Sequence, residues 1–140
     1  MARRKGRILA FQALFSWDMG NGDVASMMEF PWTRGSSAQT EVQNESEVFA
    51  RLLVAGTIEH VAEIDEVIKR HLDSWDFKRI NKVDLAILRI SVYPLLYQKD
   101  LHPSIVINEA VDISKEFGSE DSYKFVNAVL DSIRKELGGV

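Results

Sequence analysis

The sequence contains no cysteine, and it has only 3 prolines and 8 glycines among 140 residues. The absence of cysteine excludes a disulfide framework and thiolate metal sites, and it suits a reducing compartment. No apolar run approaches the roughly 18 residues that a membrane-spanning helix needs. The basic start is not expected to be a signal peptide, because Gln12 and Asp18 interrupt the apolar run and no small-residue cleavage site follows. We therefore predict a cytoplasmic protein without a membrane segment.

The sequence also lacks the strict apolar–polar alternation that indicates β-strands, and apolar residues recur instead at helical spacing. Helices are predicted over about 3–19, from 44 to about 72 in two parts, from 81 past Pro94, from 103 to 117, and from about 119 to 137. A chain of this length fits one domain with a real core. We predict an all-α fold in a single domain, 1–140, with about six or seven helices and an irregular loop at about 20–43.

Local signals refine these boundaries. Asn81 is expected to start a helix that is apolar on most sides, which predicts a central helix packed by several others. Pro103 fits the first position of the next helix, where a missing N–H does no harm. Ser119 is expected to cap the last helix. In the irregular segment, Asp23 is expected to cap a short helix. Val48 starts an apolar row at helical spacing that continues through Leu52, Ala55 and Ile58.

Charge is distributed unevenly along the chain. The net charge is −4, yet residues 1–9 hold four cations and no acid: Arg3, Arg4, Lys5 and Arg7. A basic cluster on an acidic body is a directional electrostatic feature that favours a polyanion. The alternative is a solvated terminus that aids solubility. The row Arg3, Arg7, Phe11 and Phe15 passes from charge to aromatic along one helix face, so Phe15 is either a core residue or a stacking platform.

Nothing in the sequence indicates catalysis. The three histidines, His60, His71 and His102, lie far apart and share no metal-ligand motif. Glycine-rich phosphate loops and the GxSxG and HExxH motifs are absent. We expect neither an enzyme nor a bound cofactor or metal. Phe125 lies beside the core stripe of the last helix, so it is either at the core margin or a surface platform for a base.

Four stretches together resemble the NusB transcription antitermination family. They are the basic start with QALFSW at 12–17, VDLAILRI at 83–90, INEAV at 107–111, and FGSEDSYKFVNAVLD at 117–131. The match runs in order over nearly the whole chain, apart from about 20–44, and the last stretch is very specific.

The resemblance implies a NusB-like fold of two small helical bundles packed across each other. It implies binding of boxA, a single-stranded RNA element, together with NusE, a small-subunit ribosomal protein, in a transcription elongation complex. The acidic body would suit a basic ribosomal protein.

By position, the resemblance also implies an RNA-binding set. The residues are Arg3, Arg4, Lys5, Arg7, Gln12, Phe15, Asp84, Asp121, Lys124 and Phe125. The family usually has Tyr where this chain has Phe15. Phe15 lacks the hydroxyl of that Tyr but keeps the ring face for stacking. The assignment of Asp84 to the RNA-binding set is weaker than the others, because the acidic residue that the family has at this position lies at either the RNA or the NusE surface. We expect the fold to bring the basic start and Asp121–Phe125 together as two halves of one site.

Two other interpretations stay open. NusB-like helical domains also occur at the N-terminus of ribosomal RNA cytosine methyltransferases, although no nucleotide-binding βαβ pattern is present here. The chain could instead be a protein-interaction module that forms a homodimer.

Overall fold

The computed structural model describes residues 2–20, 41–72 and 76–138. Within these ranges it is all-α, as predicted, and contains no strand. No helix in the described ranges is long and apolar enough to cross a membrane. The α-helices are α1 (Ala2–Asp18), α3 (Glu41–Glu59), α4 (Val61–Arg70), α5 (Lys82–Tyr97), α6 (Pro103–Phe117) and α7 (Ser122–Glu136), and a 3-10 turn, η2 (Phe77–Arg79), precedes α5.

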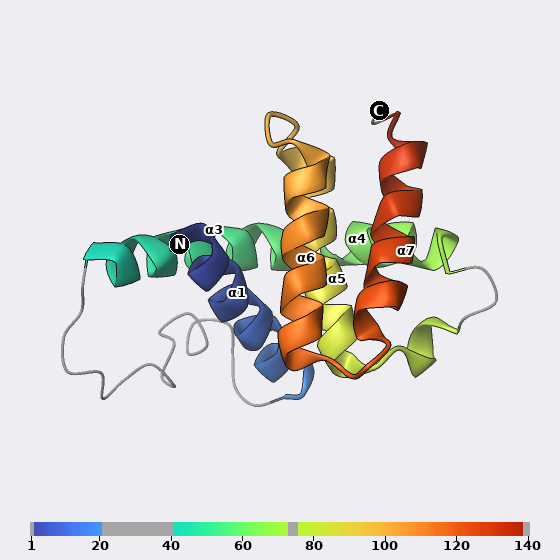
Figure 1. Ribbon diagram of the computed structural model, residues 1–140, viewed down its shortest axis with the longest axis horizontal. Coiled ribbons are helices and arrows are strands. Elements are labelled where there is room, and N and C mark those ends of the chain that lie inside the picture. Colours follow the sequence, from blue (N-terminus) through green and yellow to red (C-terminus); the bar gives the residue numbers. More distant parts are fainter. Residues whose placement is uncertain (1, 21–40, 73–75, 139–140) are drawn as a thin grey trace.

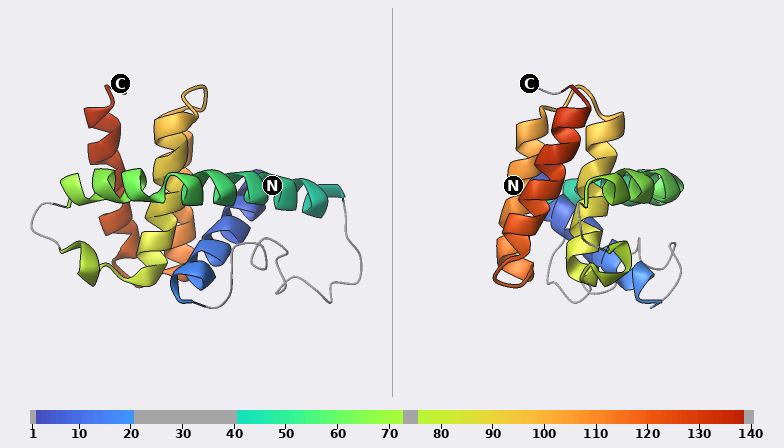
Figure 2. Two further views of the ribbon diagram at one scale, coloured as in Figure 1. Left: turned by 180° about the vertical axis from the view of Figure 1, so that it is seen from behind. Right: turned by 90° about the vertical axis from the view of Figure 1, so that its right-hand side faces the viewer.

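Helix α5 is the centre of the fold. It packs against α1, α3, α4, α6 and α7, which confirms the central position predicted from its apolar sides. Figure 1 shows α5, α6 and α7 running side by side, with α3 and α4 crossing behind them and α1 slanting down beside α6, on the side away from α7. In the right-hand view of Figure 2, which looks along α3, this helix lies on the side of the three-helix layer that is formed by α5.

The helix starts follow local chemistry. The Asn81 side chain accepts hydrogen bonds from the backbone N–H groups of Val83 (2.8 Å) and Asp84 (3.3 Å), which caps α5 as expected. His102 caps α6 by accepting from the Ser104 N–H at 3.2 Å. Pro94 lies inside α5, three residues before its end.

Two expectations about helix starts need correction. Ser119 does not cap the last helix, because α7 begins at Ser122 and Asp121 occupies the N-cap position without a side-chain cap bond. The backbone N–H of Ser119 is instead held by the Ser122 hydroxyl at 2.9 Å. Helix α3 starts at Glu41, inside the loop predicted for about 20–43. The short helix predicted after Asp23 lies outside the described residues.

The apolar row on α3 faces outward except at its last member, Ile58, which is half-buried against the core. Val48 and Leu52 are exposed, and so is Ala55. The buried face of the helix is formed by Ala50, Leu53, Val54 and Thr57. Because α3 is apolar on both faces, sequence periodicity alone did not identify the face that packs.

Candidate nucleic-acid interface

The basic start of the chain forms the first two turns of α1, and its four cations have different surroundings. Arg3, Arg4 and Lys5 are exposed. The Arg4 guanidinium donates to Glu109 and to Asp112 of α6, each at 2.7 Å, and these hydrogen bonds raise its pKa. Arg4 therefore ties α1 to α6 and is already neutralised.

Arg7 lies against α3 instead. Only 7% of it is exposed, and its guanidinium lies 5.4 Å from the ring centroid of Phe49. Arg3 lies over the same ring at 5.2 Å. Burial lowers the pKa of Arg7. The Glu109 carboxylate acts in the opposite direction, and the positive charges of Arg3 and Arg4 reinforce the effect of burial.

The other end of α1 is fixed to α5 by a cluster of charges. The carboxylate of Asp18 lies 3.2 Å from Lys82 Nζ and 3.5 Å from Arg89 Nη1. Arg89, which is buried, also donates to both carboxylate oxygens of Asp65 on α4, at 2.9 and 2.8 Å. Its guanidinium lies 5.9 Å from the Trp17 ring. One buried arginine thus holds the end of α1, α4 and α5 in register.

A hollow of about 310 Å³ lies where α5 and α7 begin, and we call it the α5–α7 hollow. Figure 1 shows that the end of α1, the start of α5, the end of α6 and the start of α7 lie at the same end of the molecule. The lining residues of the hollow are Arg79, Ile80, Asn81, Asp84, Ser119, Asp121, Ser122 and Phe125.

Asp84 is the unusual group in this hollow. It is 7% exposed, and its Oδ1 atom is buried without a hydrogen-bond partner. Burial raises the pKa of Asp84, while a hydrogen bond from the Ser122 side chain acts in the opposite direction. A buried acceptor without a hydrogen bond costs free energy of folding. The Asp84 carboxyl can therefore accept a hydrogen bond from an N–H or O–H group of a bound molecule.

The first turn of α7 supplies the other predicted groups. Phe125 is half-buried: it packs against the core and also lines the hollow, so its position agrees with either of the two roles left open by the sequence. Asp121 also lines the hollow, and the exposed Lys124 lies on the same turn, with its Nζ 3.9 Å from Asp121. Aromatic, acceptor and cationic groups are the set that stacks a base, binds its edge and meets a phosphate.

The structure does not place the two predicted halves in one hollow. Arg3 and Arg7 line a separate groove of about 670 Å³ between α3 and α6, which we call the α3–α6 groove, and it shares no residue with the α5–α7 hollow. Gln12 and Phe15, both half-buried on α1, lie along the helix between the basic start and the charge cluster at Asp18. Helix α6 packs against α7, and it is joined to α1 by the Arg4 ion pairs with Glu109 and Asp112 and by the ring contact between Phe11 and Phe117, so it connects the two parts.

Sequence reasoning did not assign four polar lining residues of the hollow to the site, namely Arg79, Asn81, Ser119 and Ser122. A cation two residues before the helix cap at Asn81 was the available signal for Arg79. Nothing in the sequence indicated that Ser122 of α7 would meet Asp84 of α5. In the described ranges, no group of three or more His, Cys, Asp or Glu side chains could hold a metal ion.

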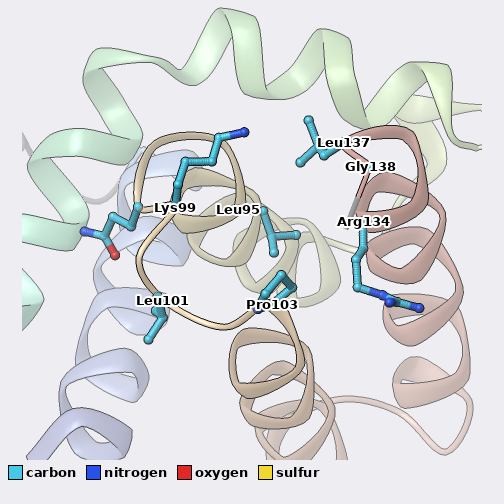
Figure 3. Close-up of a pocket in the computed structure, with 8 residues that line it drawn as sticks. Leu95, Lys99, Leu101, Pro103, Arg134, Leu137 and Gly138 are labelled. Atoms are coloured by element: carbon cyan, nitrogen blue, oxygen red, sulfur yellow. The ribbon is translucent and has the colours of Figure 1, made fainter. Parts of the chain in front are cut away.

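A third hollow, of about 180 Å³, contains none of the predicted residues. Figure 3 shows Leu95, Lys99, Leu101 and Pro103, around the α5–α6 turn, facing Arg134 and Leu137 at the end of α7. We assign it no role in nucleic-acid binding.

Comparison with known proteins agrees with this geometry. The model of the NusB family matches residues 4–135. The transcription antitermination protein NusB of Treponema denticola is 51% identical over 136 residues, which cover 97% of this chain and 98% of that protein.

Solved structures give the same result. T. maritima NusB has a TM-score of 0.79 and 33% identity, covering 96% of this chain and 91% of that one. A crystal structure of the antitermination factors NusB and NusE in complex with double-stranded RNA contains a chain with a TM-score of 0.83 and 27% identity, covering 96% and 97%.

Proposed function

The chain belongs to the NusB family, and on that premise we propose that it is an RNA-binding transcription antitermination factor. It would bind boxA-type single-stranded RNA together with the ribosomal protein NusE, act on the transcription elongation complex in the cytoplasm, and catalyse no reaction. The observation that carries this proposal is the α5–α7 hollow, which is lined both by Asp84, with its buried and unpaired carboxyl oxygen, and by Phe125.

Each residue at the hollow has a role that its chemistry supports. Phe125 offers a ring face on which a base stacks, since every base has a π-face. Asp84 and Asp121 accept hydrogen bonds from base N–H groups, which gives sequence selectivity. Lys124 neutralises a phosphate at the same turn.

Helix α1 extends the surface away from the hollow. Gln12 offers an amide that hydrogen-bonds a base or sugar, and Phe15 offers part of a ring face. Arg3 and Lys5 are exposed cations and contact phosphates. Arg4 and Arg7 should contribute less, because a phosphate would have to replace the Arg4 ion pairs or reach the buried Arg7.

The test is the affinity of the protein for a boxA oligonucleotide after changes at Phe125. Replacement by Ala should weaken binding by about 1–3 kcal/mol if a base stacks on the ring. Phe125→Leu is the matched control, because it keeps apolar contact with the core and still removes the stacking face. If both variants bind RNA like the parent while their melting temperatures fall, Phe125 is a core residue alone.

The methyltransferase alternative is not favoured. The chain spans 98% of the T. denticola protein, which is named as an antitermination protein, so the relatives do not carry it as one part of a longer enzyme. The homodimer alternative is distinguished by sedimentation with and without RNA, because a dimer that masks α1 would dissociate when RNA binds.

A further inference from the structure

Among the described residues that line the α5–α7 hollow, Arg79 is the only one with a positively charged side chain. Two carboxylic acids, Asp84 and Asp121, line the same hollow. An RNA strand that places a base here would bring its phosphates close to these acids, and like charges repel each other. Binding at the hollow therefore needs a cation beside it, and the roles given above leave Arg79 unused.

The backbone fixes the position of Arg79. It is the last residue of η2, which the Asp76 side chain caps by accepting from the Lys78 N–H at 3.0 Å. The Arg79 N–H donates to the Asp76 carbonyl at 2.9 Å, and the next residue, Ile80, is buried in the core. Asn81 then caps α5. Arg79 is thus held between two helix caps and beside a core residue, so its side chain starts from a rigid position at the hollow.

The guanidinium of Arg79 is available for a ligand. Its side chain is exposed, and it forms no ion pair with any carboxylate that the structure describes, although Asp84 and Asp121 line the same hollow. Arg4 differs, because Glu109 and Asp112 already neutralise it. A guanidinium presents N–H donors in a planar fork that matches two oxygens of one phosphate. Arg79 can therefore bind a phosphate without first breaking an internal ion pair.

The inner part of the hollow suits a base and not a phosphate. Asp84 is 7% exposed, and its Oδ1 has no hydrogen-bond partner within the described part of the chain. A ligand group that reaches this oxygen has to supply an N–H or O–H donor. Base edges carry N–H donors, whereas a phosphate diester carries only acceptors. Because Arg79 is exposed and Asp84 is buried, a base fits the inside and its phosphate fits the edge, beside Arg79.

We propose that Arg79 binds the phosphate of the nucleotide whose base enters the α5–α7 hollow, and so fixes the RNA strand at that nucleotide. This inference rests on the proposed function, because it requires that RNA binds at the hollow. A phosphate contact positions the strand without reading the base. Asp84 and Phe125 remain the groups that meet the base itself.

The substitution Arg79→Gln tests the contact, and Lys78→Gln is the matched control. Both residues are exposed cations of η2, but Lys78 is not among the residues that line the hollow. Arg79→Gln should weaken binding of a boxA oligonucleotide about tenfold, as expected for the loss of a charged hydrogen bond. The log–log slope of affinity against salt should become shallower by about 0.7, the value for one phosphate of a single strand. Lys78→Gln should leave both quantities close to those of the parent.

A second experiment identifies the phosphate. Each linkage of the oligonucleotide is replaced in turn by an uncharged methylphosphonate. At one linkage the replacement should weaken binding to the parent and to Lys78→Gln about tenfold, and should have little further effect on Arg79→Gln. That linkage should adjoin the nucleotide whose replacement by an abasic residue weakens binding to the parent but not to Phe125→Leu.

Three results would overturn the inference. Equal affinity and equal salt slope for Arg79→Gln and the parent would show that Arg79 does not contact RNA. A lower affinity with an unchanged slope and an altered base preference would make Arg79 a reader of a base. A defect that appears only when NusE is present would assign Arg79 to the protein partner. Failure of the parent to prefer boxA over scrambled RNA is a separate result, because it contradicts the proposed function itself and this inference with it.

Discussion

A single buried carboxyl, Asp84, connects stability and binding. Its pKa is raised above the ordinary value of 3.8 because burial penalises the charged form. The folded state therefore holds this proton more tightly than the unfolded chain does. As pH rises through the unfolded value and then the folded one, the unfolded chain loses the proton first, so this group makes the fold less stable at neutral pH than at acidic pH.

The Asp84→Asn variant should remove this contribution. Its free energy of unfolding should rise relative to the parent as pH goes from acidic to neutral, and urea unfolding over a pH series measures the difference. RNA affinity should also fall in Asp84→Asn, because the side-chain NH2 group of Asn donates a hydrogen bond where a carboxylate oxygen of Asp84 accepts one from the RNA. A parent–variant difference that stays constant with pH would contradict the account of Asp84.

At the scale of elements, α1 is held against α3 by a close approach at Gly6. A Cβ added at Gly6 would lie 2.5 Å from the Phe49 ring and 3.0 Å from the Ser46 backbone oxygen. Gly6→Ala would gain about 1 kcal/mol in helix propensity. It would lose about 1–3 kcal/mol by overpacking, since the backbone of α3 has to shift.

We therefore expect Gly6→Ala to lower the melting temperature, with a net loss of up to about 2 kcal/mol. Ala55→Gly is the control, because Ala55 is on the exposed face of α3 and its replacement changes helix propensity without changing packing. It should lower the free energy of unfolding by about 1 kcal/mol. A stabilised Gly6→Ala protein would show that α1 and α3 are not packed this closely.

The charge cluster around Arg89 makes a second prediction at this scale. Arg89→Met should cost about 3 kcal/mol, because it leaves the mostly buried carboxylate of Asp65 without its arginine and leaves Asp18 paired with Lys82 alone. The exposed Lys135, which pairs with Asp131 on α7, is the control. Its replacement by Met should change the free energy of unfolding by less than about 1 kcal/mol. Equal effects in urea unfolding would mean that Arg89 does not hold α1 to α5.

Much of the element structure could be predicted from the sequence. The cap at Asn81, the proline start at Pro103 and the core stripe of the last helix all depend on residues within one or two turns. The start of α7 was predicted wrongly, because Asp121 and not Ser119 occupies its N-cap position, and the Ser119 side chain bonds that of Ser122. Their hydrogen bond to each other, rather than to the helix backbone, decides the outcome.

The candidate site was less accessible to sequence reasoning. Its residue types came from a family resemblance, but the meeting of Asp84 with Ser122 joins residues of α5 and α7 that no local pattern relates. The ion pairs of Arg4 with α6 and the burial of Arg7 also depend on tertiary packing. The basic segment therefore seemed uniform in the sequence and has three distinct environments in the fold.

At the scale of the whole molecule, an acidic body carries exposed cations at the start of α1 and on α7. The Arg3→Ala/Lys5→Ala variant should bind boxA RNA with a shallower salt dependence. Each lost phosphate contact reduces the log–log slope by about 0.7 for a single strand. Affinity measured from low to moderate salt gives this slope. An unchanged slope would mean that Arg3 and Lys5 do not contact RNA phosphates. The preference of the variant for boxA over other sequences should stay the same, because phosphate contacts do not read the base sequence.

The central claim is that this protein recognises boxA RNA jointly with NusE. The most direct measurement is its affinity for a boxA oligonucleotide and for a scrambled oligonucleotide of the same composition, each with and without purified NusE. The account predicts tighter binding to boxA than to the scrambled RNA, and a further gain for boxA when NusE is added. Equal affinity for the two RNAs in the presence of NusE would contradict it.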